Sequence, residues 1–367
     1  MFIKELQLVN FRNYENLYIT LSKGVNVFCG DNAQGKTNIL EALYFCSLGK
    51  SHRTTKDKEL IQWGKDNAYV KLNVERKPLD KKIEVKIFKQ CKKGVSINSI
   101  NIKKLSDLIG VLNVVMFSPE DLKIVKDSPS HRRKFIDMEL CKLSKKYFYN
   151  LSQYKKVLEE RNAALKKLKG ESSILDIYDE QLSNLGSEII KARLNYIEML
   201  NEYGKKIHKD ISRDKEVIHF DYISSLKKLE DLNVIENEFL NLLRKNRKKD
   251  IDSKVTSVGP HRDEFSIEIN GVDTRSYGSQ GQQRTSVLTI KFASLEIIKK
   301  VTNEYPILLL DDVLSELDLN RQRYILGSIN KVQTLITCTG IMDINKQIGT
   351  NSRIFKVSEG KVEEMSK

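Results

Sequence analysis

Long apolar segments are missing from this sequence of 367 residues. No stretch approaches the roughly 20 apolar residues that a membrane-spanning helix needs. The first residues, MFIKELQLVNF, alternate like a strand and lack the apolar core and cleavage site of a signal peptide. We therefore expect a protein of the cytoplasm that does not enter a membrane.

Cysteine is scarce and scattered along the chain. The five cysteines form no CxxC pair and no Cys/His cluster, which argues against a disulfide framework and a zinc site. We expect reduced, buried thiols at Cys29, Cys46, Cys91, Cys141 and Cys338.

Acidic residues are too few to balance the basic ones. The chain has 63 Lys and Arg against 49 Asp and Glu, which gives a net charge of +14 and a pI near 9.3. This excess favours a polyanionic partner, nucleic acid before a membrane surface. A solvated lysine-rich surface is the alternative interpretation.

Proline is absent between Pro129 and Pro260. Apolar residues recur at helical spacing up to about residue 210, with a break at 169–173, and predict two long helices in an antiparallel hairpin. A third helix is expected over about 225–245. The lysine-rich segments 166–169 and 244–249 are interpreted as solvated or DNA-facing surfaces.

Both ends of the chain have α/β character. Strands are expected over 2–10, 17–21, 24–29, 68–74, 83–88, 95–97, 111–117, 264–269, 307–310 and 334–338, helices over 36–48, after residue 280 and over 319–329, and hairpin turns at 270–271 and 359–360.

The segment Gly30–Thr37, GDNAQGKT, has the GxxxxGK[ST] pattern of a phosphate-binding loop between an expected strand and an expected helix. Gly30 and Gly35 let backbone N–H groups converge on phosphate oxygens at the helix N-terminus. Lys36 would neutralise these oxygens, and the Thr37 hydroxyl would bind Mg²⁺.

Two further motifs lie near the other chain end. The apolar strand 307–310 ends in Asp311, placed to bind Mg²⁺, and Asp312, placed to orient or deprotonate water. Ser279 and Gly281 open a helix and offer a hydroxyl and N–H groups to a second anion, although an ordinary helix cap has the same pattern. A second anion site suggests the γ-phosphate bound by a second subunit.

Eight motifs occur in one order along the chain: NFRNYE (10–15), GDNAQGKTNILEAL (30–43), GKSHRT (49–54), FSPEDL (117–122), RRKFID (132–137), GPHRDE (259–264), SQGQQRT (279–285) and LLLDDVLSELD (308–318). This set resembles the ABC-type ATPase heads of SMC proteins, and most closely the bacterial RecF family of recombination-repair proteins. The resemblance covers nearly the whole chain.

The resemblance implies a P-loop ATPase head built from both chain ends, with an inserted helical arm. The N-terminal part of the head with its β subdomain would span 1–128, the arm 129–250, and the C-terminal part 251–367. ATP and Mg²⁺ are the implied cofactors. The nucleotide-contacting residues would be Gly30, Asp31, Asn32, Ala33, Gln34, Gly35, Lys36, Thr37, Arg12, Arg53, Ser279, Gly281 and Gln282, with Thr37 and Asp311 on the metal, and Lys36, Asp312 and Ser279 in catalysis.

The resemblance also implies partners. The family forms ATP-dependent homodimers, binds single-stranded DNA, double-stranded DNA or their junctions, and supports RecA loading with RecO and RecR during replication restart and the SOS response. The loop 315–318 would link the two ATP sites across the dimer.

Four positions depart from related ATPases. Asp312 replaces a common glutamate, so we expect a weak, DNA-stimulated ATPase that acts as a switch. No histidine occurs at 337–339, where the expected strand ends. Ala33 replaces a glycine of the phosphate-binding loop, and Asp127 replaces the family's usual glycine before Ser128-Pro129. The alternatives are a transporter's cassette subunit and an ATPase of a nuclease-associated or chromosome-organising complex.

Overall fold

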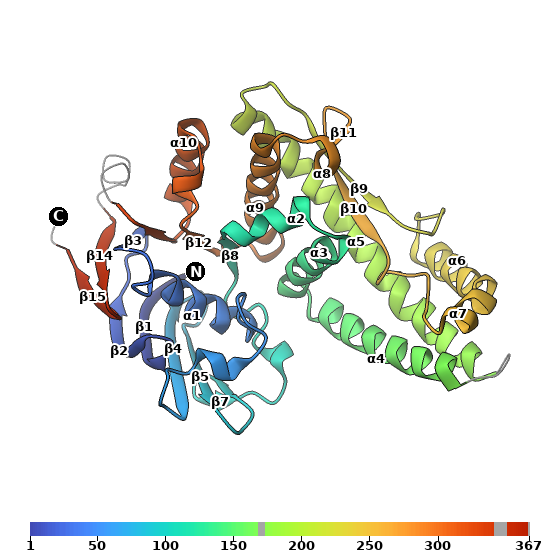
Figure 1. Cartoon of the computed structure of the whole chain (residues 1–367), viewed down its shortest axis with the longest axis horizontal. Coiled ribbons are helices and arrows are strands. Elements are labelled where there is room, and N and C mark those ends of the chain that lie inside the picture. Colours follow the sequence, from blue (N-terminus) through green and yellow to red (C-terminus); the bar gives the residue numbers. More distant parts are fainter. Residues whose placement is uncertain (168–172, 341–350, 366–367) are drawn as a thin grey trace. The chain divides into compact units, whose positions relative to one another are not determined.

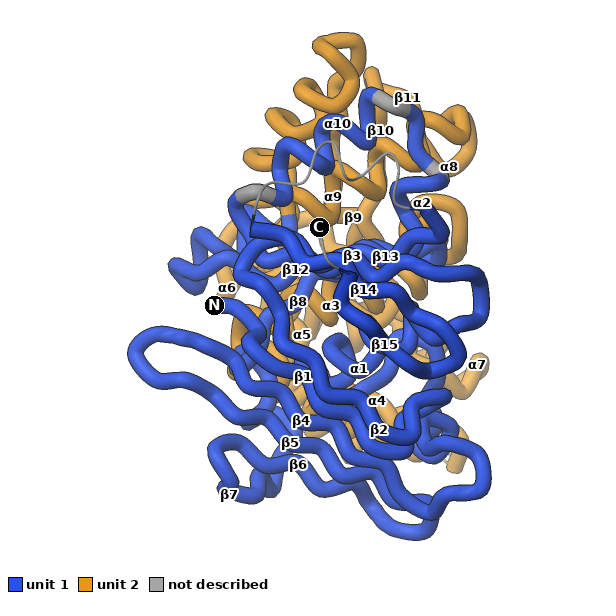
Figure 2. Tube along the Cα trace, turned by 90° about the vertical axis from the view of Figure 1, so that its left-hand side faces the viewer, with its two compact units in different colours: residues 1–121, 294–367 blue, residues 122–293 orange. Residues whose placement is uncertain are grey.

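The chain folds into two compact units, and the computed structural model describes residues 1–167, 173–340 and 351–365 (Figures 1 and 2). The first unit contains residues 1–121 and 294–367, so both chain ends build it. The second contains residues 122–293. The predicted break at 169–173 falls almost wholly on residues 168–172, outside the described residues.

A mostly parallel sheet forms the centre of the first unit. Its strand order is β15-β14-β3-β13-β12-β8, and only the β14–β15 pair is antiparallel. Every residue of β3, β12 and β13 is buried, as expected for short apolar strands covered on both faces. The strands are β3 (Val25–Cys29), β8 (Val114–Phe117), β12 (Ile307–Asp311), β13 (Thr334–Cys338), β14 (Arg353–Ser358) and β15 (Lys361–Glu364).

A second, antiparallel sheet has the order β2-β1-β4-β5-β6-β7. Its apolar face joins α1 (Lys36–Leu48) and the parallel sheet in one buried core. The strands are β1 (Phe2–Phe11), β2 (Tyr14–Thr20), β4 (Asn67–Glu75), β5 (Lys81–Phe88), β6 (Gly94–Ile97) and β7 (Ile100–Asn101). The remaining elements of this unit are η1 (Asp57–Leu60), η2 (Leu105–Asp107), η4 (Leu314–Glu316), α10 (Leu319–Ser328) and η5 (Ile329–Lys331), and η3 (Pro119–Leu122) leads out of it.

Long helices dominate the second unit, in which α4 and α5 form an antiparallel pair and α6 packs on α5 (Figure 1). A three-stranded sheet, β11-β10-β9, completes it. The elements are α2 (Lys123–Lys126), α3 (Pro129–Leu143), α4 (Lys145–Lys167), α5 (Ile174–Ser212), β9 (Ile218–Ile223), α6 (Leu232–Lys245), α7 (Arg247–Ser253), β10 (Glu264–Ile269), β11 (Val272–Asp273), α8 (Thr274–Tyr277) and most of α9 (Gln280–Thr302).

The helical region differs from its prediction in three places. The first expected helix is divided at Ser144, whose extended backbone ends α3 and whose hydroxyl accepts a hydrogen bond from the Tyr147 N–H at the start of α4. The third helix begins at Leu232, after the N-cap Asp231, and not at 225. Residues 218–223 form the unpredicted strand β9.

The strand β9 belongs to the second unit. It pairs with β10 along six residue pairs, and this pairing holds the segment after residue 250 in the second unit. Residues 251–293 thus lie in the second unit, whereas the family resemblance implies that 251–367 form the C-terminal part of the ATPase head.

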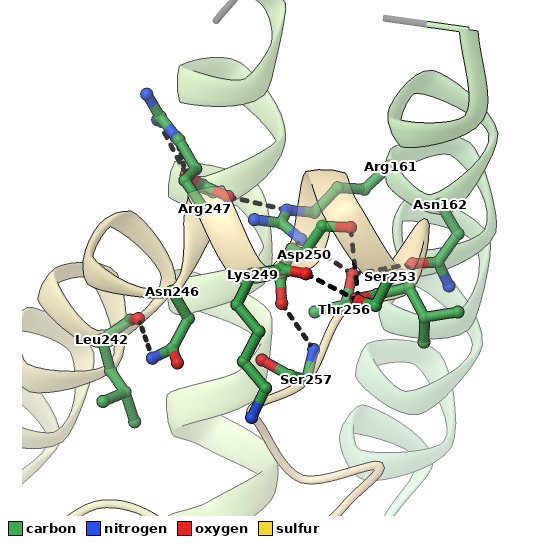
Figure 3. Close-up of polar contacts among 12 residues, drawn as sticks. Arg161, Asn162, Leu242, Asn246, Arg247, Lys249, Asp250, Ser253, Thr256 and Ser257 are labelled. Carbon is green, nitrogen blue, oxygen red and sulfur yellow. Dashed lines mark hydrogen bonds and ion pairs between the residues drawn. The ribbon is translucent and has the colours of Figure 1, made fainter. Parts of the chain in front are cut away.

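Buried charges connect the helices of the arm (Figure 3). The fully buried Arg161 of α4 forms ion pairs with Asp179 of α5 and Asp250 of α7, each with an N–O distance of 2.8 Å. Arg247 of α7 donates to the other oxygen of Asp179 and also pairs with Asp176. Since each buried charge has an opposite charge within hydrogen-bond distance, the network fixes α7 against both long helices.

Four cysteines are buried, but Cys91 is exposed because it lies in the loop between β5 and β6. Within the described residues, every helix is too short or too polar to cross a membrane.

Candidate nucleotide-binding site

The loop Gly30–Thr37 connects the end of β3 to the start of α1, as the sequence predicts. Gly30 has no room for a side chain, because a Cβ would lie 2.2 Å from the Val357 carbonyl oxygen of β14. Gly35 has a φ of 113°, and its Cβ would lie 2.5 Å from the Asn13 amide. Both glycines are therefore required by the close packing around the loop.

The N-terminus of α1 is suited to an anion. Its N-cap, Gly35, provides no side-chain cap, and its first turn contains no acidic residue. The Lys36 side chain is 4% exposed, and its ammonium donates to the carbonyl oxygens of Gly30 at 2.6 Å and Asp31 at 3.0 Å. A positive charge is thus held against the loop. The middle residues of the loop, Asp31, Asn32 and Ala33, are exposed.

The two ends of the chain meet at Asp311. Its Oδ1 accepts hydrogen bonds from the hydroxyl of Thr37 at 2.8 Å, across 274 positions, and from the hydroxyl of Thr337 at 2.9 Å. Burial raises the pKa of the Asp311 carboxyl, which the two hydroxyl donors oppose and the nearby Asp312 carboxylate reinforces. The arrangement places a hydroxyl and a carboxylate, both hard oxygen donors, beside the loop.

Asp312 has a left-handed backbone conformation, with a φ of 50°. Its N–H donates to the Thr337 hydroxyl at 2.9 Å, and its carbonyl accepts from the Ser315 hydroxyl at 2.8 Å. These contacts stabilise a conformation that L-residues other than asparagine and aspartate rarely adopt. Thr337 therefore contacts both acids, a role that the sequence analysis missed when it noted only that no histidine stands there.

Arg12 and Arg53 converge on Glu41 of α1, a residue that the sequence analysis did not select. Arg12 donates to both Glu41 oxygens at 2.9 and 2.8 Å, and Arg53 lies 3.4 Å from Oε2. Burial works to raise the pKa of the Glu41 carboxyl, but hydrogen bonds from Arg12 and Ser51 and the charges of both arginines outweigh it, so the pKa lies below its usual range. The buried glutamate thus holds both arginines near the loop helix.

The loop is supported by residues on both sides. Asn13 donates to the Gln34 carbonyl at 2.9 Å, and the Tyr14 hydroxyl donates to the Gly35 carbonyl at 3.1 Å. On the other side, the Glu359 N–H donates to the Gln34 side chain at 2.6 Å. The turns before β2 and between β14 and β15 therefore shape the loop, and only the NFRNYE motif signalled the first of them.

Ser279, Gly281 and Gln282 lie in the second unit, at the start of α9. Ser279 and Gln282 exchange hydrogen bonds: the Ser279 N–H donates to Gln282 Oε1 at 2.9 Å, and the Gln282 N–H donates to Ser279 Oγ at 3.2 Å. This reciprocal pair is a capping box. The Gln282 amide also donates to Glu216 at 3.0 Å, so this side chain stabilises its own unit.

This combination of a parallel sheet, an antiparallel side sheet, a P-loop and an inserted helical hairpin defines the class: a mixed α/β, SMC-like ABC ATPase head. The family model described as the RecF/RecN/SMC N-terminal domain matches residues 2–363. A DNA replication and repair protein RecF of Clostridium novyi is 62% identical over 362 residues, 99% of each chain. The chain belongs to this family and, within it, to the RecF proteins.

Solved structures agree with this assignment. The chain superposes with a TM-score of 0.91 and 40% identity on the recombination mediator protein RecF–ATP of the RecFOR pathway, covering 99% of both chains. A Pyrococcus furiosus Smc head with an extended coiled coil has a TM-score of 0.59 and 17% identity, over 100% of this chain and 96% of that one, and therefore shares the fold.

Proposed function

We propose that this protein is an ATP-switched DNA-binding protein of recombinational repair. The observation that carries the proposal is the contact between Thr37 and Asp311, which brings together motif residues from the two chain ends. The likeness to a RecF–ATP structure and to curated RecF proteins supports ATP as the nucleotide and DNA repair as the process.

The residues around the loop fit a nucleotide with a bound Mg²⁺. The N–H groups of the loop and the Lys36 ammonium would hold the β- and γ-phosphates. The Thr37 hydroxyl and the Asp311 carboxylate are the hard oxygen ligands that Mg²⁺ prefers, and they already adjoin each other at 2.8 Å. When bound there, Mg²⁺ would neutralise charge on the phosphate oxygens.

Asp312 is proposed to orient the attacking water. Its carboxylate is one methylene shorter than glutamate, so we propose slow hydrolysis that resets a switch. Arg12 and Arg53, fixed by Glu41, would place positive charge beside the nucleotide.

A second copy of the chain would complete the site. Ser279 and Gly281, at the exposed start of α9, would close on ATP bound to the partner's loop, and the loop at 315–318 would connect the two sites. Closure would hold DNA, either single-stranded, double-stranded or at a junction, and support RecA loading with RecO and RecR.

The switch is tested by fluorescence anisotropy of labelled gapped DNA with ATP, with ADP and without nucleotide. Wild-type protein is expected to bind at least about tenfold tighter with ATP, and Lys36→Ala is expected to lose that difference because the loop loses its only buried ammonium. Lys50→Ala, which removes an exposed lysine just after α1, is the matched control and should retain it. Equal DNA affinity of the wild type in all three nucleotide states would contradict the switch.

A further inference from the structure

Exposed lysines gather where α6 turns into α7 on the arm. Lys245, Lys248 and Lys249 are exposed and line a shallow, open hollow together with Asp252 and Ser253. We call these five residues the arm corner. Within residues 1–167, 173–340 and 351–365, none of the three ammonium groups forms an ion pair, so their charges remain available at the surface.

Three acids of the neighbouring helices are already paired with arginines and do not neutralise these lysines. Asp250 is fully buried and pairs with Arg161, and Asp176 and Asp179 pair with Arg247. These carboxylates therefore serve the interior of the arm, and Asp252 is the acid that the hollow retains. The corner carries three positive charges and one negative charge.

The arm corner is held by a rigid frame. Arg161 and Arg247 anchor α7 to α4 and α5, and the Asn246 side chain donates to the Leu242 carbonyl at 2.8 Å where the two short helices meet. In Figure 3, the Lys249 side chain extends away from the Arg161 network. Lysine side chains are flexible, so their ammonium groups can adjust to phosphates at varying spacing. Such groups on fixed helices are therefore better suited to a nucleic-acid backbone than to a single small ligand.

We propose that the arm corner is a second DNA contact, one that binds backbone phosphates of duplex DNA whether or not ATP is bound. It rests on the proposed DNA-binding function and adds a surface to it. All of its residues, and the buried network below them, belong to the second unit, whereas the nucleotide loop belongs to the first. The geometry of the corner is therefore set without the nucleotide.

The test compares two triple variants of the full-length protein. Lys245→Gln, Lys248→Gln and Lys249→Gln together remove the corner charges, and Lys155→Gln, Lys205→Gln and Lys206→Gln remove three exposed lysines elsewhere on the arm. Anisotropy of a fluorescent duplex is measured with and without ATP between about 50 and 200 mM salt. The corner variant should bind at least about tenfold more weakly, and its slope of log K against log salt should be smaller by about 2 to 3.

A substitution that should increase DNA affinity provides a further control, because partial unfolding would not increase affinity. Asp252→Asn removes the acid of the hollow and should tighten duplex binding. The corner effect should also persist in Lys36→Ala. A wild-type protein whose DNA affinity is the same with and without ATP, but which still shows the corner effect, would overturn the switch and leave the corner standing. The inference is overturned if the corner variant keeps the wild-type salt slope, or if both triple variants lose the same affinity.

Discussion

At the residue scale, Asp311 combines a cost in stability with a role in the proposed metal site. Burial raises the pKa of its carboxyl above the ordinary value, so keeping it ionised at neutral pH destabilises the fold. That cost is absent below the unfolded pKa and grows as the pH rises through the higher folded pKa. The structure thus retains a carboxylate where an uncharged residue would favour folding.

We therefore predict that Asp311→Asn raises the melting temperature of the nucleotide-free protein by about 1–3 °C at neutral pH, while Mg²⁺-dependent ATP binding is lost. Asp66→Asn removes the same charge from an exposed site and should change neither property. Calorimetry and fluorescent-nucleotide titration measure both. A variant that melts lower and still binds Mg²⁺–ATP would contradict this role of Asp311.

Asp312 tests the proposed cause of slow turnover. Lengthening the side chain in Asp312→Glu should raise the rate of DNA-stimulated phosphate release by about 3- to 30-fold, and Asp312→Asn should lower it by about 100-fold, with ATP affinity retained in both. Steady-state phosphate release gives the rates. Turnover of Asp312→Asn at the wild-type rate would remove Asp312 from the mechanism.

At the element scale, two family motifs outside the nucleotide site pack against each other in the second unit. RRKFID on α3 and GPHRDE before β10 are joined by the ion pair between Arg132 and Glu264 and by a hydrogen bond from Arg133 to the Asp263 carbonyl at 3.0 Å. His261 lies between Tyr154 and the Thr256 carbonyl, at 2.8 and 3.1 Å. The neutral ring with its proton on Nε2 satisfies both partners.

This environment predicts a pH-dependent stability. Burial lowers the pKa of His261 to about 4, with a further decrease from Arg262 and Arg133, although the Thr256 carbonyl opposes it. The resulting stabilisation of about 3 kcal/mol is complete above the ordinary value near 6.5 and is lost as the pH falls from there towards 4.

His261→Gln, which can donate to Thr256 and accept from Tyr154, should therefore weaken the pH dependence. We expect the urea midpoint of the wild type to fall more between pH 7.5 and 5 than that of the variant, because only the wild type must charge a buried ring. His219→Gln, at an exposed histidine, should behave like the wild type. Parallel pH dependence in all three proteins would rule out His261 as the cause.

Helices and turns could be predicted where the signal lies within the element's own residues. The bounds of α1 follow from the loop pattern and the apolar face after it, and the turn at Asn270 and Gly271 follows from their tolerance of positive φ. The break at Ser144 could not be predicted, because serine is ordinary within helices and the division depends on packing. Strand β9 is short, and its strand conformation depends on pairing with β10, which is distant in the sequence.

The residues of the candidate site likewise form two groups, those that a motif predicts and those that it does not. Lys36, Thr37 and Asp311 belong to motifs with a recognised chemistry. Glu41 and Thr337 do not, since their roles arise from contacts with residues distant in the chain: Arg12 and Asp311 respectively. The one available sequence signal for Glu41 was an acidic residue among the apolar residues of an expected helix.

At the scale of the whole molecule, the two proposed halves of an ATP site belong to different compact units. The loop and Asp311 lie in the first, and Ser279 in the second, with α9 continuing from one into the other. We therefore propose that Ser279 serves the nucleotide of a second copy, so that ATP would link two chains.

Light scattering of the purified protein measures this central claim most directly. With ATP, Asp312→Asn should have twice the mass of the 42.4 kDa chain, because slow hydrolysis preserves the closed state. With ADP it should have the mass of one chain. Adding Ser279→Arg should prevent the doubling by blocking closure, while Lys50→Ala should allow it. A mass of one chain for Asp312→Asn with saturating ATP would contradict the shared site.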